Sequence, residues 1–416
     1  FLDVVGSRTV THVLETHVHN DYLSGGLDLA ARTGADLVLP AGAGAGFVFV
    51  PAFHMEDLES STGLAIRPIH TPGHTPEHTS YLILIDGRPE AVFTGGSLLV
   101  GAAGRSDLLG MEYAESLSRL QYGSLHRLAT LPDETGVFPT HGEGSFCTAS
   151  GAGRTTSTIG QEKTENPLYR IPTVEEFVAD QLSVLVPYPR YYRHMGPTNR
   201  LGVTPMPPVE VPTVGVEQMA HHLAEGGAVL DGRSRHAFAA GHIPGSIGIE
   251  TGDSFAPWAG WLLPFNAPIM LVLGEGQDPG WAATELARIG FEQVHGAMVG
   301  TSRWEDDGRE LAAYRTATVG DLLDARAADA DLQILDVRDP KEWEAGHVEG
   351  STHRYVPDLE SLGLPDTLDR DRPVWVICRS GNRASIAAGI LERLGSTPVV
   401  VATGGVPDAL RQLANA

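Results

Sequence analysis

The second half of the chain contains an internal repeat, which constrains the fold more than any other feature of the sequence. Residues 230–233 (Leu-Asp-Gly-Arg) return as residues 335–338 (Leu-Asp-Val-Arg), and residues 241–246 return as residues 346–351. Both pairs lie 105 residues apart. Self-similarity at a fixed spacing marks repeated structural units, so a domain of roughly a hundred residues is duplicated here. The same spacing links Pro268 to Pro373 and residues 288–290 to residues 393–395.

Each copy alternates short apolar runs with helical patterns, which indicates a parallel α/β sheet. The apolar runs cover residues 228–230, 269–273, 334–337 and 374–377, and the helical patterns cover residues 281–289 and 384–394. We predict three domains, at residues 1–205, 206–303 and 314–416, with the Pro-rich residues 205–212 as a linker. In the first domain we expect a helix over residues 174–185 and a polar loop over residues 148–166.

Composition and charge narrow the class of function. The 416 residues carry 29 Lys and Arg against 52 Asp and Glu, a net charge of −23, so binding to nucleic acid or to an anionic membrane is disfavoured. No apolar stretch is long enough to span a membrane. The two cysteines, Cys147 and Cys378, cannot build a disulfide framework, which favours a reducing, cytoplasmic location. We expect Cys147 to be structural, and a chain that opens on Phe1 to lack its true start.

One cysteine lies where a nucleophile would be expected. The apolar run 374–377 ends at Cys378, and a polar, Gly-containing segment precedes the next helical pattern. A helix N-terminus and nearby arginines favour the thiolate form of a cysteine. The alternative, a buried structural cysteine, does not account for that polar segment. The candidate catalytic residues are Cys378, Arg379, Ser380, Gly381, Asn382 and Arg383.

These residues resemble the active loop of the rhodanese family, Cys-Arg-Ser-Gly-x-Arg, and residues 335–338 and 346–351 resemble the family's upstream motifs. The resemblance implies that Cys378 carries sulfane sulfur as a persulfide and passes it to an acceptor. Asp336 and Arg338 are then expected to form an ion pair that supports the loop. The first copy has Leu273 in place of the cysteine, so we expect it to be non-catalytic.

Histidines gather in the first domain. His17 and His19 follow an apolar run, His74 lies in a Thr-Pro-Gly-His-Thr turn, and His141 follows Pro-Thr. Several histidines, each placed after an apolar stretch and a turn, suit a first-row metal ion.

The same motifs resemble the metallo-β-lactamase fold, an αββα sandwich whose first strands would here be missing. Within that fold the likeness is to the persulfide dioxygenases, also called sulfur dioxygenases, which often occur fused to rhodanese domains. The resemblance implies one Fe(II) in the N-terminal domain, with Zn(II) as the alternative metal. The family holds its iron with two histidines and an aspartate, and the resemblance supplies His17 and His74 here but no carboxylate. His19, Asp21 or a water would supply the remaining ligand, and His141 is a further candidate.

Two positions depart from the pattern. Tyr22 stands where the hydrolases of this fold have a histidine, and Gly96 stands where the fold has a metal-binding aspartate. Both positions serve a second metal, so a two-metal hydrolase site is disfavoured, and an inactive metal site stays open. Arg105 and Asp107 either bind a thiol substrate or close a loop, and Tyr22 is a candidate substrate contact.

The sequence thus predicts an α/β multidomain enzyme with two activities in sulfide detoxification. One is Fe(II)- and O2-dependent oxidation of a small thiol persulfide to sulfite, and the other is sulfur transfer by Cys378. The alternative is a thiosulfate sulfurtransferase whose N-terminal domain is non-catalytic or hydrolyses thioesters as glyoxalase II does. Expected partners are small thiols, thiosulfate and sulfite, and a homo-oligomer is left open, as are the thiol carrier and the direction of sulfur flow.

Overall fold

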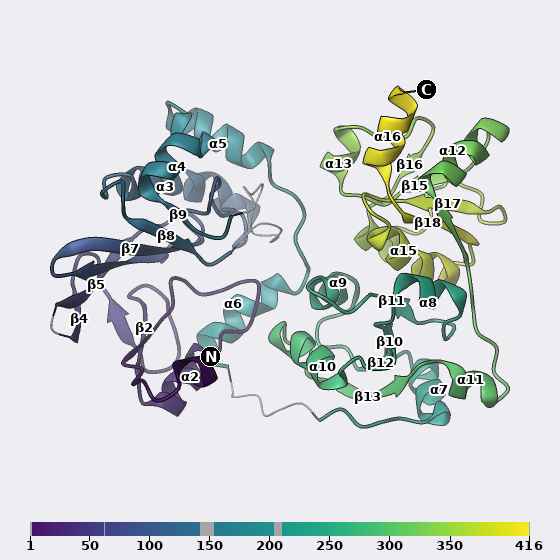
Figure 1. The fold of residues 1–416 in the computed structure, drawn as a ribbon, viewed down its shortest axis with the longest axis horizontal. Helices are drawn as coiled ribbons and strands as arrows, with labels where there is room; N and C mark the ends of the chain where they lie inside the picture. The colour runs from purple at the N-terminus through teal and green to yellow at the C-terminus, as the bar shows by residue number, and fades with distance from the viewer. Residues whose placement is uncertain (1, 62, 142–153, 204–209, 416) are drawn as a thin grey trace. The chain divides into compact units, whose positions relative to one another are not determined.

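The computed structural model describes residues 2–61, 63–141, 154–203 and 210–415. They form two compact units, residues 1–206 and 207–416 (Figure 1). Cys147, predicted to be structural, lies outside the described residues. Among the described helices, none combines the length and the apolar character needed to cross a bilayer.

Unit 1 contains two β-sheets. The first is parallel and has the order β1 (His12–Leu14), β2 (Asp36–Pro40), β3 (Val50–Ala52). The second is mostly antiparallel, with a parallel pair between β7 and β8, and its six strands follow chain order. Its strands are β4 (Leu58–Ser61), β5 (Leu64–His70), β6 (Thr79–Ile85), β7 (Arg88–Gly95), β8 (Gly136–Pro139) and β9 (Ser157–Thr158).

Alternation along β2 places this strand between two layers. Val38 faces the second sheet and packs with Tyr81 of β6, whereas Leu37 and Leu39 pack with Ala30 of α2 (Gly26–Thr33). Successive side chains of a strand point to opposite faces, so β2 contacts a helix on one side and a sheet on the other.

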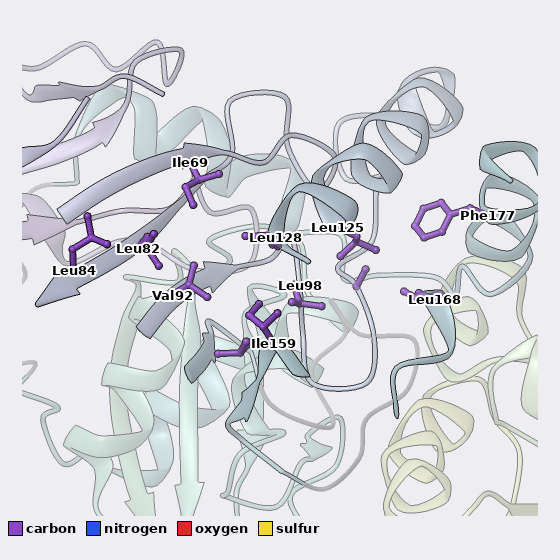
Figure 2. Close-up of a cluster of buried hydrophobic side chains, with 12 residues drawn as sticks. Ile69, Leu82, Leu84, Val92, Leu98, Leu125, Leu128, Ile159, Leu168 and Phe177 are labelled. Atoms are coloured by element: carbon purple, nitrogen blue, oxygen red, sulfur yellow. The ribbon is translucent and has the colours of Figure 1, made fainter. Parts of the chain in front are cut away.

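The outer face of the second sheet is covered by helices α3 (Met111–Leu128), α4 (Ile159–Glu165) and α5 (Val174–Ser183). Figure 2 shows this core, in which Leu82 and Val92 from the strands pack with Leu125, Ile159 and Phe177 from the helices. The layers are therefore helix, sheet, sheet, helix, which is the αββα sandwich that the sequence predicts. The remaining helices of unit 1 are α1 (Leu2–Val5), the 3-10 helix η1 (Pro167–Arg170) and α6 (Tyr192–Leu201).

The predicted helix over residues 174–185 corresponds to α5. The predicted polar loop over residues 148–166 is wrong over its second half, where β9 and α4 form. The side chain of Thr158 accepts a hydrogen bond from the backbone of Gln161 and so caps α4. Ile159 is fully buried in the core of Figure 2, and this tertiary packing outweighs the polar composition of the segment.

Unit 2 consists of two α/β copies, each built on a parallel sheet. The sheet of the first copy has the order β11-β10-β12-β13 and that of the second has the order β14-β18-β17-β15-β16. The strands are β10 (Ala228–Asp231), β11 (Ile247–Gly248), β12 (Ile269–Leu273), β13 (Val294–Val299), β14 (Arg315–Thr318), β15 (Ile334–Asp336), β16 (Thr352–His353), β17 (Val374–Ile377) and β18 (Pro398–Thr403).

The helices follow the repeat as well, since α10 (Pro279–Arg288) and α15 (Asn382–Arg393) come directly after the central strands β12 and β17. Trp304, one residue past the predicted boundary of the first copy, packs in the core of that copy. The first copy also contains α7 (Val216–Ala224), α8 (Arg235–Ala240), α9 (Phe255–Leu262) and α11 (Ser302–Asp306). The second contains α12 (Val319–Ala328), α13 (Pro340–Glu344), the 3-10 helix η2 (Val356–Asp358), α14 (Leu359–Leu362) and α16 (Val406–Ala414).

Candidate functional site

Cys378 lies at the carboxyl end of the buried strand β17, with α15 beginning four residues later. Only 1% of the side chain is exposed, and the backbone N–H of Gly381 donates a hydrogen bond to its Sγ at 3.1 Å. Gly381 has a φ of +92°, and a Cβ there would fall 2.3 Å from the carbonyl oxygen of Ala402. The loop therefore requires glycine both for its backbone conformation and for space.

Arg383 closes the loop at the first turn of α15. Its Nη2 donates to Oε1 of Glu342 at 2.9 Å, its Nη1 contacts Oε2 of the same carboxylate, and Asp339 lies 3.8 Å away. Burial alone would raise the pKa of Glu342, but the Arg383 guanidinium outweighs burial and lowers that pKa to about 2. A fixed cation therefore stands in the loop, and Arg383 also interacts electrostatically with Cys378.

The other predicted residues of this region take two different places. Arg379 and Ser380 are exposed, at the mouth of the loop. Asp336 and Arg338 form a buried ion pair at the end of β15, with Nε of Arg338 2.9 Å from both carboxylate oxygens. Nη2 of Arg338 also donates to the carbonyl of Gly346, so this pair ties the strand end to the segment that follows α13.

The equivalent loop of the first copy has no nucleophile and is filled by an amide. Leu273 is fully buried at the position of Cys378. The side chain of Gln277 accepts a hydrogen bond from the backbone of Gly274 at 2.5 Å and donates to Gly232 O at 2.8 Å and Thr251 Oγ1 at 2.6 Å. These hydrogen bonds close the loop on itself.

A residue that the sequence did not single out reaches the cysteine loop from the first copy. Nη1 of Arg235, at the start of α8, donates to the carbonyl of Ser380 at 3.1 Å. The contact joins residues 145 positions apart. Sequence patterns report local structure, so no motif could have indicated it.

In unit 1, the structure brings His17, His19 and His74 together in a buried cluster. The ring centroids of His17 and His19 are 4.2 Å apart, and those of His17 and His74 are 4.8 Å apart. His17 follows β1, and His74 lies in the turn between β5 and β6. All three rings are almost fully buried.

Each of these three imidazoles uses one ring nitrogen for a hydrogen bond within the protein. Nδ1 of His17 bonds Thr16 Oγ1 at 2.9 Å, Nε2 of His19 bonds the Tyr22 hydroxyl at 2.9 Å, and Nδ1–H of His74 donates to Arg105 O at 2.8 Å. Nε2 of His17 and Nδ1 of His19 are left buried without a hydrogen bond among the described residues. In His17, one nitrogen is oriented by the protein and the other is free, which is the arrangement of metal-ligating histidines. Nδ1 of His19 instead faces Oδ1 of Asp21 at 3.7 Å.

Burial and mutual repulsion keep two of the three rings neutral. Burial lowers the pKa of His17 well below its ordinary value and lowers that of His74 to about 4, and neighbouring histidines add to both shifts. Burial also opposes charge on His19, but the carboxylates of Asp21 and Glu15 outweigh it and raise the pKa of His19 to about 9. His17 and His74 therefore present lone pairs at neutral pH.

The two further candidate ligands lie at the edge of the cluster. Nε2 of His141 is 3.1 Å from Oδ2 of Asp21, and Oδ1 of Asp21 is 3.7 Å from Nδ1 of His19. Tyr22 stacks on His19 with ring centroids 4.3 Å apart. The structure thus places all the predicted ligands in one region, with Tyr22 beside them.

The donor chemistry and the orphaned nitrogens fit a metal ion, but the arrangement stops short of a formed centre. No three His, Cys, Asp or Glu side chains of the described residues group in a way that could hold a metal ion. At Gly96, where the fold has an aspartate, a Cβ would fall 2.3 Å from Cδ2 of His74. The ring of His74 therefore occupies the space that the aspartate side chain would need.

His78 belongs to the support of the cluster. Its Nε2 accepts a hydrogen bond from the backbone of Gly96 at 3.0 Å, so its Nδ1–H donates to Thr71 Oγ1 at 2.9 Å. Both ring nitrogens are used, which leaves none for a metal. His70, by contrast, is partly exposed at the end of β5.

Arg105 and Asp107 form a buried ion pair in which Nε and Nη2 each donate at 2.7 Å to one carboxylate oxygen. Nη2 of Arg105 also donates to Val186 O, and the guanidinium lies 4.7 Å from the ring centroid of Tyr188. These contacts favour the loop-closing alternative over substrate binding. The carbonyl of Arg105 in turn orients His74.

A cleft of about 570 Å³ opens beside the cluster. Its lining includes His19, Tyr22 and the stacked rings of Phe93 and Phe138. A concave site with apolar walls and a few polar groups is the usual form of a small-molecule site.

Comparison with known proteins agrees with this architecture. The family model of the rhodanese-like domain matches residues 216–307 and 319–411. A metallo-β-lactamase from Staphylococcus aureus subsp. aureus COL has a solved structure 28% identical in sequence, covering 70% of this chain and 84% of that chain with a TM-score of 0.62. The structure of ETHE1 from Myxococcus xanthus is 35% identical and covers 47% of this chain and 78% of that chain, with a TM-score of 0.40.

Among curated proteins, the hydroxyacylglutathione hydrolase of Methylobacterium sp. (strain 4-46) is 32% identical over 134 residues, which are 32% of this chain and 49% of that protein. The chain spans about half the length of the hydroxyacylglutathione hydrolases that it matches. Together with the cysteine loop, these likenesses indicate an enzyme. The chain belongs to the proteins in which a unit of the metallo-β-lactamase fold is joined to two rhodanese-like domains.

Proposed function

We propose that this chain is a sulfur-handling enzyme in which Cys378 carries sulfane sulfur as a persulfide. The observation that carries the proposal is the N–H of Gly381, which donates to Sγ of Cys378 at 3.1 Å inside a loop closed by the Arg383 cation. A backbone donor and a nearby cation both stabilise negative charge on sulfur. The loop thus supports a thiolate before attack and a persulfide anion after it.

The proposed transfer balances without an outside oxidant. The Cys378 thiolate attacks the outer sulfur of thiosulfate, the S–S bond of thiosulfate breaks, and its electron pair leaves with sulfite. A thiolate acceptor then attacks the outer sulfur of the Cys378 persulfide, which releases the Cys378 thiolate and forms the acceptor persulfide. Arg379, exposed beside the loop, offers local positive charge to these anions on a chain whose net charge is −23.

For unit 1 we propose that His17, His19 and His74 hold one Fe(II), with Asp21 and His141 as further candidates and Zn(II) as the alternative metal. Nε2 of His17, buried without a hydrogen bond among the described residues, supports this assignment. His19 would have to give up the proton that Asp21 and Glu15 stabilise before it could bind the metal. Bound Fe(II) would supply reactivity towards O2. The overall change is RSSH + O2 + H2O giving RSH and sulfurous acid, in which the terminal sulfur is oxidised and O2 is reduced.

The residues of unit 1 have separate parts in this proposal. Thr16, Tyr22 and the Arg105 carbonyl orient the three imidazoles. The cleft lined by Phe93 and Phe138 takes the carbon portion of a small thiol persulfide. Tyr22, which lies on both the cleft and His19, is the candidate contact for the sulfur end.

The competing candidate keeps sulfur transfer but makes unit 1 either non-catalytic or a thioester hydrolase. The missing three-donor group among the described residues favours the non-catalytic form. The 32% identity to a hydroxyacylglutathione hydrolase favours the hydrolase form. The substrates in each case are small thiol compounds or sulfur oxyanions, and the proposed location is the cytoplasm.

The test compares the full chain with Cys378→Ser and, as a matched control, Cys147→Ser. We expect Cys378→Ser to abolish sulfur transfer from thiosulfate to a thiol while Cys147→Ser retains it; unchanged transfer in Cys378→Ser would contradict the assignment. The same proteins, loaded anaerobically with Fe(II), are then given glutathione persulfide in air-saturated buffer. Oxygen uptake matched by sulfite, and equal in all three proteins, supports the dioxygenase.

Two other outcomes would replace the proposal for unit 1. Hydrolysis of an acyl-glutathione with two bound zinc ions would make unit 1 a thioester hydrolase. Failure to retain any metal after anaerobic loading would make it a non-catalytic scaffold beside the Cys378 domain.

A further inference from the structure

The catalytic loop of the second copy receives a contact from the copy that has no cysteine. Arg235 begins α8 of the first copy, and its Nη1 donates to the carbonyl of Ser380 at 3.1 Å. Both copies belong to the same compact unit, residues 207–416. The Arg235 side chain is 21% exposed, and its contact with Ser380 lies at the surface of the unit.

The carbonyl that Arg235 contacts belongs to the peptide group whose N–H serves the nucleophile. The peptide between Ser380 and Gly381 accepts from Arg235 at its oxygen and donates to Sγ of Cys378 from its nitrogen, each at 3.1 Å. Hydrogen bonds in such a chain polarise one another. A cation on the oxygen therefore makes the N–H a better donor to a negatively charged sulfur.

The peptide group between Ser380 and Gly381 could rotate unless a second contact holds it. Gly381 has a φ of +92°, and glycine has access to more backbone conformations than any other residue. If the peptide rotated, its N–H would leave Sγ. Arg235 Nη1 holds the opposite end, and a Cβ on Gly381 would lie 3.0 Å from that nitrogen, so the guanidinium is packed directly against the peptide.

Arg235 is itself held by Glu250 of the first copy. Nε of Arg235 donates to Oε2 of Glu250 at 2.8 Å, its Nη2 contacts the same oxygen, and its backbone N–H donates to Oε1 at 2.8 Å. Burial alone would raise the pKa of Glu250, but these contacts outweigh it and lower the pKa. The carboxylate takes one side of the fork and leaves Nη1 for Ser380.

Other contacts hold the two copies together around this point. Nε2 of His242 lies 2.9 Å from Oε2 of Glu392, and the ring of Trp261 meets that of Tyr355 edge-on at 5.6 Å between centroids. On Gly389 a Cβ would fall 2.9 Å from Ser246 O. The interface between the two copies is therefore held by several contacts besides the one from Arg235 to Ser380.

We propose that Arg235 is a positioning residue of the Cys378 site, so that the copy without a cysteine sets the orientation of the Gly381 N–H in the copy that has one. This inference rests on the proposed sulfur transfer at Cys378. Arg235 touches neither the sulfur nor a substrate, and it acts through the peptide group between Ser380 and Gly381.

The experiment measures the reactivity of Cys378 itself, because that readout does not require sulfur transfer. Full-length protein and its Arg235→Met, Arg235→Lys and Glu250→Gln variants are alkylated with iodoacetamide from pH 5 to pH 10. The rate at Cys378 is followed by mass spectrometry of its peptide. Arg288→Met is the matched control, since Arg288 is an exposed arginine of the same copy that pairs with Glu285 on its own helix.

We expect Arg235→Met to slow alkylation near pH 7 by about threefold to tenfold and to move the profile to higher pH, because one charge-assisted contact is lost. Arg235→Lys should recover part of the rate, Glu250→Gln should give a smaller shift in the same direction, and Arg288→Met should match the parent protein. In assays of sulfur transfer from thiosulfate, Arg235→Met should lower kcat by a larger factor than it raises KM.

Profiles of Arg235→Met and Glu250→Gln that both coincide with the parent would overturn the proposal. So would an equal loss in Arg235→Lys and Arg235→Met, because a cation would then not be the requirement. If Arg235→Met does not fold, the alkylation profile of Glu250→Gln alone tests the proposal. A shifted profile in a protein that transfers no sulfur would contradict the proposed function while leaving the role of Arg235 standing.

Discussion

Gly96 lies so close to His74 that a Cβ at residue 96 would fall 2.3 Å from Cδ2 and 2.8 Å from Nε2 of the imidazole. The φ of Gly96 lies outside the left-handed range. The requirement for glycine is therefore one of space, set by a buried ring whose Nδ1–H is already bonded to Arg105 O.

Gly96→Ala should destabilise unit 1 by about 1–3 kcal/mol, because a methyl group added to a packed interior forces side chains from their preferred positions. Denaturant unfolding of the full chain, followed by circular dichroism, measures the change. Gly123→Ala in α3 is the matched control: its Cβ would meet nothing within 4 Å, so it should stabilise the helix by about 0.5–1 kcal/mol. Equal effects at the two positions would show that His74 does not fill that space.

Removing His17 or His74 should weaken the retention of Fe(II). We expect His17→Ala and His74→Ala to bind the metal at least about tenfold more weakly than the parent, measured by metal analysis after anaerobic loading and desalting. His126→Ala, an exposed histidine of α3, should retain as much as the parent. Equal retention in all three variants would place any metal elsewhere.

Gly381→Ala should impair the Cys378 loop more than a simple backbone cost predicts. The left-handed conformation at φ +92° costs a residue with a Cβ about 1–2 kcal/mol, and the methyl group would also lie 2.3 Å from Ala402 O. We expect sulfur transfer to fall by more than about tenfold as the N–H leaves Sγ.

Gly350→Ala separates these two effects. Gly350 also has a positive φ, +84°, but a Cβ there would meet nothing within 4 Å. This variant should lose stability while its transfer rate stays within about twofold of the parent, because the added methyl group would touch no atom of the cysteine loop. A comparable loss of rate in both variants would argue that stability, and not loop geometry, limits the reaction.

The ion pair between Glu342 and Arg383 should make unit 2 sensitive to acid. The pKa of Glu342 is lowered to about 2 in the folded chain and is ordinarily near 4.5 in an unfolded one. The stabilisation is therefore fully present above about pH 5 and is lost as the pH falls towards 2. The difference in unfolding free energy between the parent and Glu342→Gln should shrink over that interval, as measured by urea unfolding.

Glu349→Gln is the control for this pH dependence. Its carboxylate is 94% exposed and lies 3.3 Å from Arg326, and exposed pairs contribute little. Its difference from the parent should stay close to zero from pH 3 to pH 7. A slope as steep as that of Glu342→Gln would assign the acid sensitivity to general surface charge.

Much of unit 2 could be predicted from the sequence because the repeat shows the pattern of the same fold twice. The central strands β12 and β17 fall on the predicted apolar runs, and α15 falls on the predicted helical pattern after Cys378. The helix α4 could not be predicted, since its place depends on Ile159 entering a distant core and on the buried carboxylate of Glu162, which accepts a hydrogen bond from the backbone of Gly101. The local pattern of apolar residues indicates the type of secondary structure. It does not indicate into which hydrophobic core one apolar residue packs.

The candidate sites divide in the same way. The cysteine loop is contiguous in the chain, so its motif could be found in full, whereas the contact from Arg235 depends on how two copies pack. In unit 1 the histidines could be found by motif, but the space that His74 takes from residue 96 depends on the fold. Whether three metal-donor atoms lie close enough to bind one ion depends on distances in the folded chain. The spacing of the residues along the sequence does not give those distances.

The amide of Gln277, with its three hydrogen bonds inside the first copy's loop, limits what a single substitution can do there. Leu273→Cys would place a thiol beside a loop whose polar groups already bond that amide. Asp278, which lies 105 residues before Arg383, caps α10 with a carboxylate where the second copy has a cation. Building a second cysteine loop in this copy therefore calls for changes at all three positions together.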